Sequence, residues 1–228
     1  MVTDGAVDDP NQLSRLYRNR FDAKELAEKQ ILWSALRKGM FQQYVPESGT
    51  VLDLGAGNCE FSNAIHARRR VAVDLNPETK HFANPAVEVL QTSSTDLSAL
   101  TDGSLDTVFT SNFFEHLASK DVLMETLRES YRVLAPGGRI VVLMPNIRYV
   151  GIRYWDYLDH YLPLTHLSLV EGLELAGFST ERVIPRFLPY TVRDSKLPVT
   201  AGLVRLYLWF RPIWPVLGGQ MLVVARRP

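Results

Sequence analysis

The chain of 228 residues has a single cysteine, no excess of either charge and no long apolar run. One cysteine excludes an internal disulfide framework and is compatible with a reducing compartment, so we expect a cytoplasmic protein. Its 25 basic and 25 acidic residues give a formal net charge of zero. No overall field therefore attracts nucleic acid, and we expect no nucleic-acid partner. No apolar run reaches the roughly 18 residues of a membrane-spanning helix, and residues 1–12 are polar and acidic, unlike a signal peptide.

Composition and pattern favour one globular domain with added segments. Hydrophobic residues make up 46% and charged residues 22% of the sequence, as in ordinary globular proteins. We predict an N-terminal helical lid or cap over residues 1–45 and a main domain over residues 46–228, with inserts at about 145–167 and 188–219. The lid is predicted from amphipathic helical spacing, in which apolar residues recur at Leu13, Leu16, Tyr17, Leu26, Ile31, Leu32, Leu36 and Phe41.

Residues 51–61 have the pattern of a buried strand, a glycine turn and the start of a helix. Gly55 and Gly57 can take backbone angles closed to other residues, and they let a ligand lie directly against the main chain. The helix that follows points free N–H groups and the positive end of its dipole into the turn. This arrangement predicts a nucleotide-type site at the carboxyl edge of a parallel sheet.

The side chains of this turn indicate which nucleotide it binds. The dinucleotide fingerprint has a third glycine where this chain has Glu60, which would repel a pyrophosphate and disfavours a dehydrogenase. Asp53 also suits a ligand with positive charge, such as S-adenosylmethionine (SAM). Residues 53–57 (Asp-Leu-Gly-Ala-Gly) resemble the first motif of class I SAM-dependent methyltransferases, with Cys59 at the position that is often a third glycine.

The resemblance extends along residues 45–187 and includes residues 132–139 (Arg-Val-Leu-Ala-Pro-Gly-Gly-Arg). It implies an α/β, Rossmann-like fold: a seven-stranded, mostly parallel sheet with an antiparallel last strand and helices on both faces. We place the strands at residues 50–54, 71–74, 87–91, 105–111, 139–144, 178–187 and 220–225. Helices are expected at residues 60–67, 119–134 and 168–177, the last with Ser168 as N-cap, Glu171 completing a capping box and Gly177 as its stop.

The same resemblance implies the cofactor-binding residues, beginning with Asp53, Gly55 and Gly57. Asp74 ends the second strand about twenty residues after the glycines, where an acid accepts the ribose hydroxyls. Asp96 is the acid expected at the adenine amine, although an Asp that opens a helical turn is equally expected from capping alone. Backbone contacts near Asn112 complete the set, and the product of SAM is S-adenosylhomocysteine.

Methyl transfer from a sulfonium is an in-line displacement, so the protein mainly aligns donor and acceptor. A hydroxyl acceptor must lose its proton as it attacks, and histidine is the usual base near neutral pH. His116, His160 and His166 are the candidates, although His166 could instead cap a helix or hold the insert in place. Asp159 could orient an imidazole. Asp156, Asp159, His160 and His166 could form a metal site, but their spacing does not require one and we predict none.

The acceptor is less specified than the cofactor. The two inserts resemble those of methyltransferases of bacterial polysaccharide and glycolipid synthesis, which implies a hydroxyl of a sugar or lipid-linked sugar. A polyketide or quinone ring and a non-catalytic SAM-binding regulatory domain are the alternatives. The apolar, aromatic residues 188–219 can be core or lid packing, a homodimer surface, or a patch that contacts a membrane beside a lipid-linked substrate.

Overall fold

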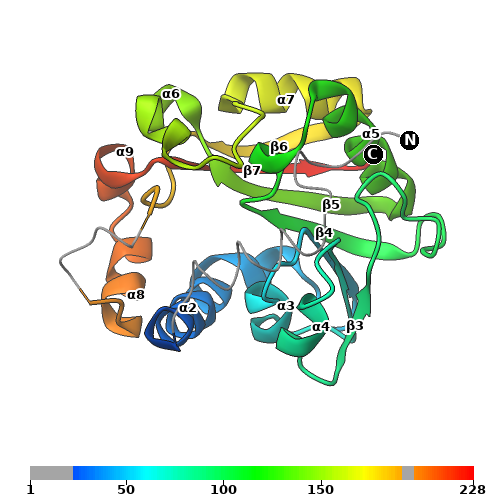
Figure 1. Cartoon of the computed structure of the whole chain (residues 1–228), viewed down its shortest axis with the longest axis horizontal. Coiled ribbons are helices and arrows are strands. Elements are labelled where there is room, and N and C mark those ends of the chain that lie inside the picture. Colours follow the sequence, from blue (N-terminus) through cyan, green and yellow to red (C-terminus); the bar gives the residue numbers. More distant parts are fainter. Residues whose placement is uncertain (1–22, 192–197) are drawn as a thin grey trace.

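The structure, a computed structural model, describes residues 23–191 and 198–228. It contains a seven-stranded sheet of order β3-β2-β1-β4-β5-β7-β6, and Figure 1 shows this sheet with the helices packed around it. All neighbouring strands are parallel except β7, which is antiparallel to both β5 and β6. The predicted Rossmann-like fold is therefore confirmed. The strands are β1 (Thr50–Leu54), β2 (Arg69–Val73), β3 (Val87–Leu90), β4 (Leu105–Ser111), β5 (Leu134–Pro145), β6 (Ser179–Ile184) and β7 (Gln220–Arg226).

Helices cover both faces of this sheet. The α-helices are α2 (Ala23–Leu36), α3 (Glu60–Ala64), α4 (Thr79–Phe82), α5 (Lys120–Val133), α6 (Ile147–Val150), α7 (His166–Leu175), α8 (Ala201–Trp209) and α9 (Trp214–Leu217). Shorter helical turns are η1 (Arg37–Phe41), η2 (Gln42–Tyr44), η3 (Phe114–His116), η4 (Gly151–Asp156) and η5 (Arg211–Ile213). In Figure 1, α5 and α7 lie on one side of the sheet, and α2, α3 and α4 lie on the other.

Alternating strand residues build a core on each side of the sheet. On β5, Ile140 packs into the core that includes Leu127 of α5 and Leu173 of α7. Its neighbour Val141 packs into the opposite core, with Phe61 of α3. Successive strand side chains point to opposite faces, and a parallel sheet covered by helices buries both. This double burial explains why the strands have continuous apolar runs in the sequence.

Some predicted boundaries shift for visible reasons. Strands β1 and β4 match their predicted ranges, whereas β5 begins at Leu134, because Leu134 pairs with Leu105 before a register shift. The predicted N-cap of α7 is wrong. Thr165 is the cap, and its hydroxyl accepts from the Ser168 N–H while Ser168 bonds back to the Thr165 N–H. The cap therefore lies three residues earlier than predicted, and the helix begins at His166.

The two inserts fold onto the edges of the domain. The first contains α6 and η4, and the second contains α8, η5 and α9. Helix α8 packs beside α2 (Figure 1), and Leu208 and Trp214 are buried in the same core as Phe61. Core packing is thus confirmed for part of the second insert. Leu206 and Trp209 remain exposed there, and a dimer or membrane role for that surface stays a prediction.

The N-terminal segment is described only from residue 23 onward. Leu13, Leu16 and Tyr17, which were expected on a helix face, lie outside the described residues. Within α2, Lys29 forms an ion pair of 2.9 Å with Glu60 at the start of α3. This contact places α2 next to the glycine turn, and its role as a lid stays a prediction. In the described part of the chain, helices are all too short or too polar to cross a bilayer.

Candidate cofactor and acceptor site

The glycine turn between β1 and α3 has three residues in left-handed conformation. Gly55 has a φ of 72°, Gly57 of 52° and Cys59 of 58°. Glycine takes these angles without strain, whereas a residue with a Cβ pays about 1–2 kcal/mol. Position 59, the third of these, therefore favours glycine because of its left-handed backbone conformation. Here the Cys59 side chain is fully buried in a small apolar cluster, and that burial offsets part of the strain.

Asp53 lies beneath the turn and joins β1 to α3. Its Oδ2 accepts hydrogen bonds from both the N–H and the hydroxyl of Ser62. Burial raises the pKa of the Asp53 carboxyl to about 7, against the lowering effect of those two bonds. Asp53 thus fixes the start of α3 relative to the strand, and its predicted contact with the cofactor stays a prediction.

Asp74 lies just past the end of β2, where an acid at the ribose position was predicted. Its Oδ2 accepts from the Gly57 N–H at 2.7 Å, and its Oδ1 accepts from the Asn76 N–H at 2.8 Å. Burial raises the pKa of this carboxyl despite these bonds. The structure therefore brings Asp74 and the glycine turn together at the carboxyl edge of the sheet.

The loop after β4 lies directly over the same turn. Asn112 is exposed and left-handed, with a φ of 50°, and its N–H donates to the Leu143 carbonyl at 2.8 Å. The Phe113 ring packs against Gly55, where an added Cβ would lie only 2.7 Å from Phe113 Cβ. A contact of Phe113 with the glycine turn was not predicted from the sequence. The sequence feature that could have indicated it is the aromatic pair Phe113-Phe114 before Glu115 and His116.

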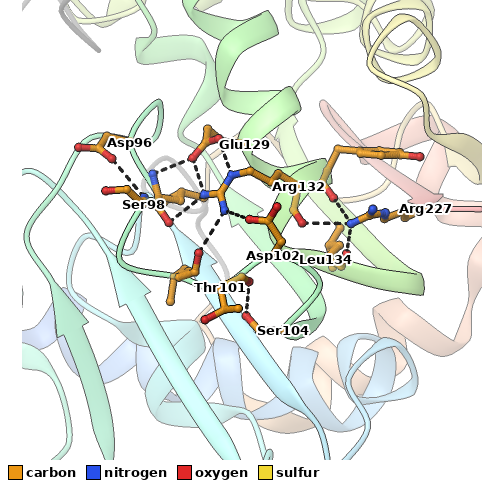
Figure 2. A network of polar contacts seen from close by, with 12 residues as sticks. Asp96, Ser98, Thr101, Asp102, Ser104, Glu129, Arg132, Leu134 and Arg227 are labelled. Atoms are coloured by element: carbon orange, nitrogen blue, oxygen red, sulfur yellow. Dashed lines mark hydrogen bonds and ion pairs between the residues drawn. The ribbon is translucent and has the colours of Figure 1, made fainter.

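Asp96 is exposed and lies in the loop after β3 (Figure 2). The Ser98 N–H donates to its Oδ1 at 3.1 Å, and hydrogen bonding from Ser98 lowers the pKa of the Asp96 carboxyl. Figure 2 shows Asp96 beside the ion pairs that Arg132 forms with Glu129 and Asp102. The bond from the Ser98 N–H fits the alternative in which Asp96 only caps a turn. Contact of Asp96 with adenine stays a prediction.

Two of the three candidate histidines come together after β4. The His116 and His160 rings have centroids 5.1 Å apart. His116 Nδ1 lies 2.7 Å from the Asp159 carbonyl oxygen and 3.3 Å from its Oδ2. His160 Nδ1 lies 2.9 Å from the Tyr154 carbonyl oxygen. Asp159 therefore orients His116, which is distant from it in sequence.

Glu115 is part of the same cluster and was not predicted. Its side chain is buried, with a relative exposure of 1%, and burial raises the pKa of its carboxyl to about 8. The Glu115 carbonyl accepts from the N–H groups of Tyr161 and Leu162, which joins η3 to the first insert. Ligand atoms of Glu115, His116 and His160 all lie within 4.8 Å of one another.

His166 has different neighbours, at the start of α7. Its Nδ1 lies 3.0 Å from Asn146 Nδ2, and its ring stacks on Tyr149 at 6.2 Å. Burial and the nearby Arg148 guanidinium lower the pKa of the His166 imidazole. These contacts fit the alternative in which His166 holds the insert in place, and a catalytic role for it stays a prediction.

The residues of the turn fit a cationic nucleoside. Residues 53–59 contain no lysine or arginine, and Asp53 and Asp74 are acidic side chains below and beside the turn. Asn58 Oδ1 is buried without a hydrogen-bond partner among the described residues, so an acceptor is available to an amino group. A pyrophosphate would meet these acids unfavourably, whereas SAM, with its sulfonium and ammonium, would not.

Family and fold comparisons agree with this site. Residues 52–142, which run from β1 into β5, match the model of the family described as "Methyltransferase domain". No curated protein matches the sequence of this chain.

Three solved structures illustrate the shared fold. A Thermotoga maritima SAM-dependent methyltransferase, described as a possible histamine N-methyltransferase, has a TM-score of 0.69 at 17% identity, covering 96% of this chain and 100% of that chain. An Archaeoglobus fulgidus SAM-dependent methyltransferase has a TM-score of 0.65 at 24% identity, covering 93% and 99%. A candidate methyltransferase in complex with the Haloferax volcanii Trm112 activator has a TM-score of 0.69 at 19% identity, covering 96% and 97%.

At such identities, likeness to solved structures establishes the fold alone. The family match over residues 52–142 contains the glycine turn, the acid after β2 and the loop after β4. Residues 52–142 therefore form a methyltransferase domain, and the activity is that of a SAM-dependent methyltransferase with SAM as its methyl donor.

Proposed function

We propose that this methyltransferase modifies a hydroxyl group of a small molecule, a sugar or lipid-linked sugar. The observation that carries the proposal is the pairing of His116 with Asp159 directly after β4. Phe113, three residues before His116, touches Gly55 of the cofactor turn. This contact supports a position of the imidazole cluster next to the place where donor and acceptor must meet.

Different residues bind the methyl donor and act on the acceptor. When bound, SAM supplies a methyl group on a sulfonium, and the electron pair of the broken C–S bond stays on the sulfur of S-adenosylhomocysteine. Gly55 and Gly57 expose main chain to the cofactor, and Asp74 is the acid for its ribose. The Asp159 carbonyl only accepts hydrogen bonds, so His116 Nδ1 carries the ring proton and Nε2 carries the lone pair that can act on an acceptor.

Aromatic rings around the cluster support a sugar or ring-shaped acceptor. The Tyr157 ring stacks on His160 with centroids 5.0 Å apart, and Tyr154 lies 4.7 Å from the same ring. Tyr190 contacts Tyr157 at 6.0 Å, which adds a side chain from the second insert. Tyr154 is fully buried, whereas Tyr157 and Tyr190 are partly exposed, so their rings can stack on a sugar ring and equally on a quinone-type ring. The exposed apolar residues of the second insert favour an acceptor that carries a lipid.

Cofactor binding is tested first, by thermal unfolding with SAM, S-adenosylhomocysteine and NAD. A ligand at 100 times its Kd stabilises the native state by about 2.7 kcal/mol, so the first two should raise Tm and NAD should not. Asp74→Asn should weaken the response, with Asp121→Asn, an exposed acid on α5, as control. An unchanged response in Asp74→Asn would remove the ribose assignment.

Acceptor class is tested by methyl transfer from labelled SAM to sugars, polyprenyl-linked sugars and phenols. We expect product with a sugar-containing acceptor and a decrease in kcat of roughly 10²–10⁴ in His116→Asn, with SAM affinity unchanged. Product with phenols alone would assign the ring alternative. SAM binding without turnover of any acceptor would favour the regulatory alternative.

A further inference from the structure

We propose that Glu115, His116 and His160 form a binding site for one divalent metal ion of the Zn²⁺, Fe²⁺ or Mn²⁺ class. The three side chains come from two segments, η3 and the turn after η4, that meet beyond the carboxyl end of β4. Their ligand atoms all lie within 4.8 Å of one another. Among residues 23–191 and 198–228, this is the group of His, Cys, Asp and Glu side chains with such geometry.

Backbone carbonyls fix both imidazoles in the form that binds metal. His116 Nδ1 lies 2.7 Å from the Asp159 carbonyl, and His160 Nδ1 lies 2.9 Å from the Tyr154 carbonyl. Each Nδ1 must therefore donate, which leaves the lone pair of each ring on Nε2. Metal-binding histidines are held in this way, by a second hydrogen bond that sets both tautomer and orientation.

Glu115 provides independent support for a ligand at this place. Its side chain has a relative exposure of 1%, and Oε2 has no hydrogen-bond partner in the described part of the chain. A buried carboxylate oxygen without a partner is costly, and native proteins satisfy such atoms with water, a ligand or an ion. The Glu115 main chain is bonded to Tyr161 and Leu162, so the carboxyl group is held against the insert that carries His160.

The donor set decides the class of ion. Two imidazoles and one carboxylate suit zinc and first-row transition metals better than Ca²⁺ or Mg²⁺, which favour oxygen ligands. Donors around a tetrahedral zinc ion with bonds of about 2.0–2.1 Å lie roughly 3.3 Å apart. The three groups, whose ligand atoms lie within 4.8 Å of one another, would have to approach one another to bind one ion. Three protein ligands leave at least one coordination position open.

Metal binding at this site does not depend on the proposed hydroxyl methylation. Only the role of the ion in that reaction rests on the proposed function. A cation next to an acceptor hydroxyl lowers the pKa of that hydroxyl, so the proton can pass to solvent as the oxygen attacks the methyl carbon. His116 then acts as a ligand. The predicted alternative set of Asp156, Asp159, His160 and His166 is not the one that comes together, because His166 lies with Asn146 and Tyr149.

The test measures metal binding by the full chain without SAM or acceptor, so its result is separate from that of methyl transfer. EDTA-treated protein is titrated calorimetrically with Zn²⁺, Mn²⁺, Mg²⁺ and Ca²⁺. We expect one Zn²⁺ or Mn²⁺ per chain, bound at least tenfold more tightly than Ca²⁺. Glu115→Gln and His116→Asn should each weaken that binding 100-fold or more, and His166→Asn should change it by less than threefold.

Two further measurements keep the result decisive. Thermal unfolding of each metal-free variant shows that it is folded, and His116, which is only partly buried, serves if Glu115→Gln unfolds. Co²⁺ bound to the wild type should give visible ligand-field bands that both cluster variants lose. Equal Zn²⁺ affinity in wild type, Glu115→Gln and His116→Asn would overturn the proposal, as would a wild type that binds no ion.

Discussion

At the cofactor turn, the presence or absence of a Cβ atom determines which residue each position accepts. Position 55 requires glycine for two reasons: its φ is 72°, and the Phe113 ring occupies the space where a Cβ would lie. Cys59 takes the same left-handed conformation with a side chain and is buried. The turn therefore tolerates strain where packing compensates for it and requires glycine where another residue is in contact.

We expect Gly55→Ala to lower the free energy of unfolding by about 2–4 kcal/mol, because left-handed strain and overpacking against Phe113 add. The SAM-dependent rise in Tm should be lost at the same time. Gly103→Ala is the control, since its φ is 64° but the added Cβ makes only ordinary contacts, at 3.9 Å or more. That variant should lose about 1 kcal/mol in urea unfolding. Equal losses in both variants would contradict the role given to Phe113.

The raised pKa of Asp53 predicts how stability depends on pH. The Asp53 pKa is about 7 in the native state against 3.8 for an ordinary Asp. Its contribution to stability is therefore fully present below about pH 4 and is lost as pH rises through 7. Asp53→Asn should keep that stability, and we expect it to exceed the wild type by about 2 kcal/mol at pH 8.

The measurement for Asp53 is urea unfolding at pH 4.5 and pH 8. The two proteins should differ little at the lower pH and clearly at the higher one. Asp121→Asn, an exposed change on α5, should show no such pH-dependent difference from wild type. A gain in Asp53→Asn that is the same at both pH values would show that the gain does not come from ionisation.

At the scale of whole elements, Arg132 connects α5 to the loop between β3 and β4 (Figure 2). Its guanidinium donates to both carboxylate oxygens of Glu129, to Asp102, and to the carbonyls of Leu97 and Leu100. Lysine cannot form this planar fork. The residue lies in the family-like segment at 132–139, and its contacts show that this segment has a structural role.

We expect Arg132→Lys to lower the free energy of unfolding by about 1–2 kcal/mol. The estimate is modest because the Arg132 side chain is 28% exposed and solvent weakens its ion pairs. Arg128→Lys on an exposed position of the same helix is the matched control and should change stability by less than about 0.5 kcal/mol. Urea unfolding of both variants measures this. A loss in Arg132→Lys no larger than the control's would contradict the connecting role.

Elements with strong local patterns were predictable, and contacts between distant segments were not. Strands β1 and β4 have apolar runs bounded by turn residues, and their predicted ranges agree with the structure. The start of α7 was misplaced because Thr165 and Ser168 cap each other, which sequence spacing alone does not distinguish from a cap at Ser168. The glycine turn and Asp74 were recognised from spacing. Glu115 was missed because its burial depends on the first insert.

On the scale of the whole molecule, most of the exposed large apolar side chains lie on the two inserts. We define the α8–α9 apolar surface as the exposed side chains of Leu203, Leu206, Trp209, Phe210, Val216 and Leu217. Trp209 is 76% exposed, although its neighbour Leu208 is buried in the core. Because the same short helix anchors itself by one side and exposes the other, this surface can make contacts without loss of the fold.

A lipid-linked acceptor predicts that this surface binds membranes without help from charge. The chain has a formal net charge of zero, so adsorption to vesicles should depend on buried apolar area and should persist at high salt. We expect the protein to float with neutral phosphatidylcholine vesicles in 0.5 M NaCl, a concentration at which roughly all exposed charge attraction is screened. Trp209→Ser and Leu206→Ser should each reduce the bound fraction several-fold.

The matched control for this prediction is Leu175→Ser, because Leu175 is 74% exposed but belongs to α7, on the other side of the sheet. Binding that all three variants share equally would mean that the α8–α9 apolar surface is not the contact. A wild-type dimer in sedimentation that Trp209→Ser and Leu206→Ser dissociate, with no flotation, would assign the surface to a second copy of the chain. The outcomes differ because a vesicle accepts any exposed apolar residue of this surface, whereas a dimer requires the two copies to fit each other.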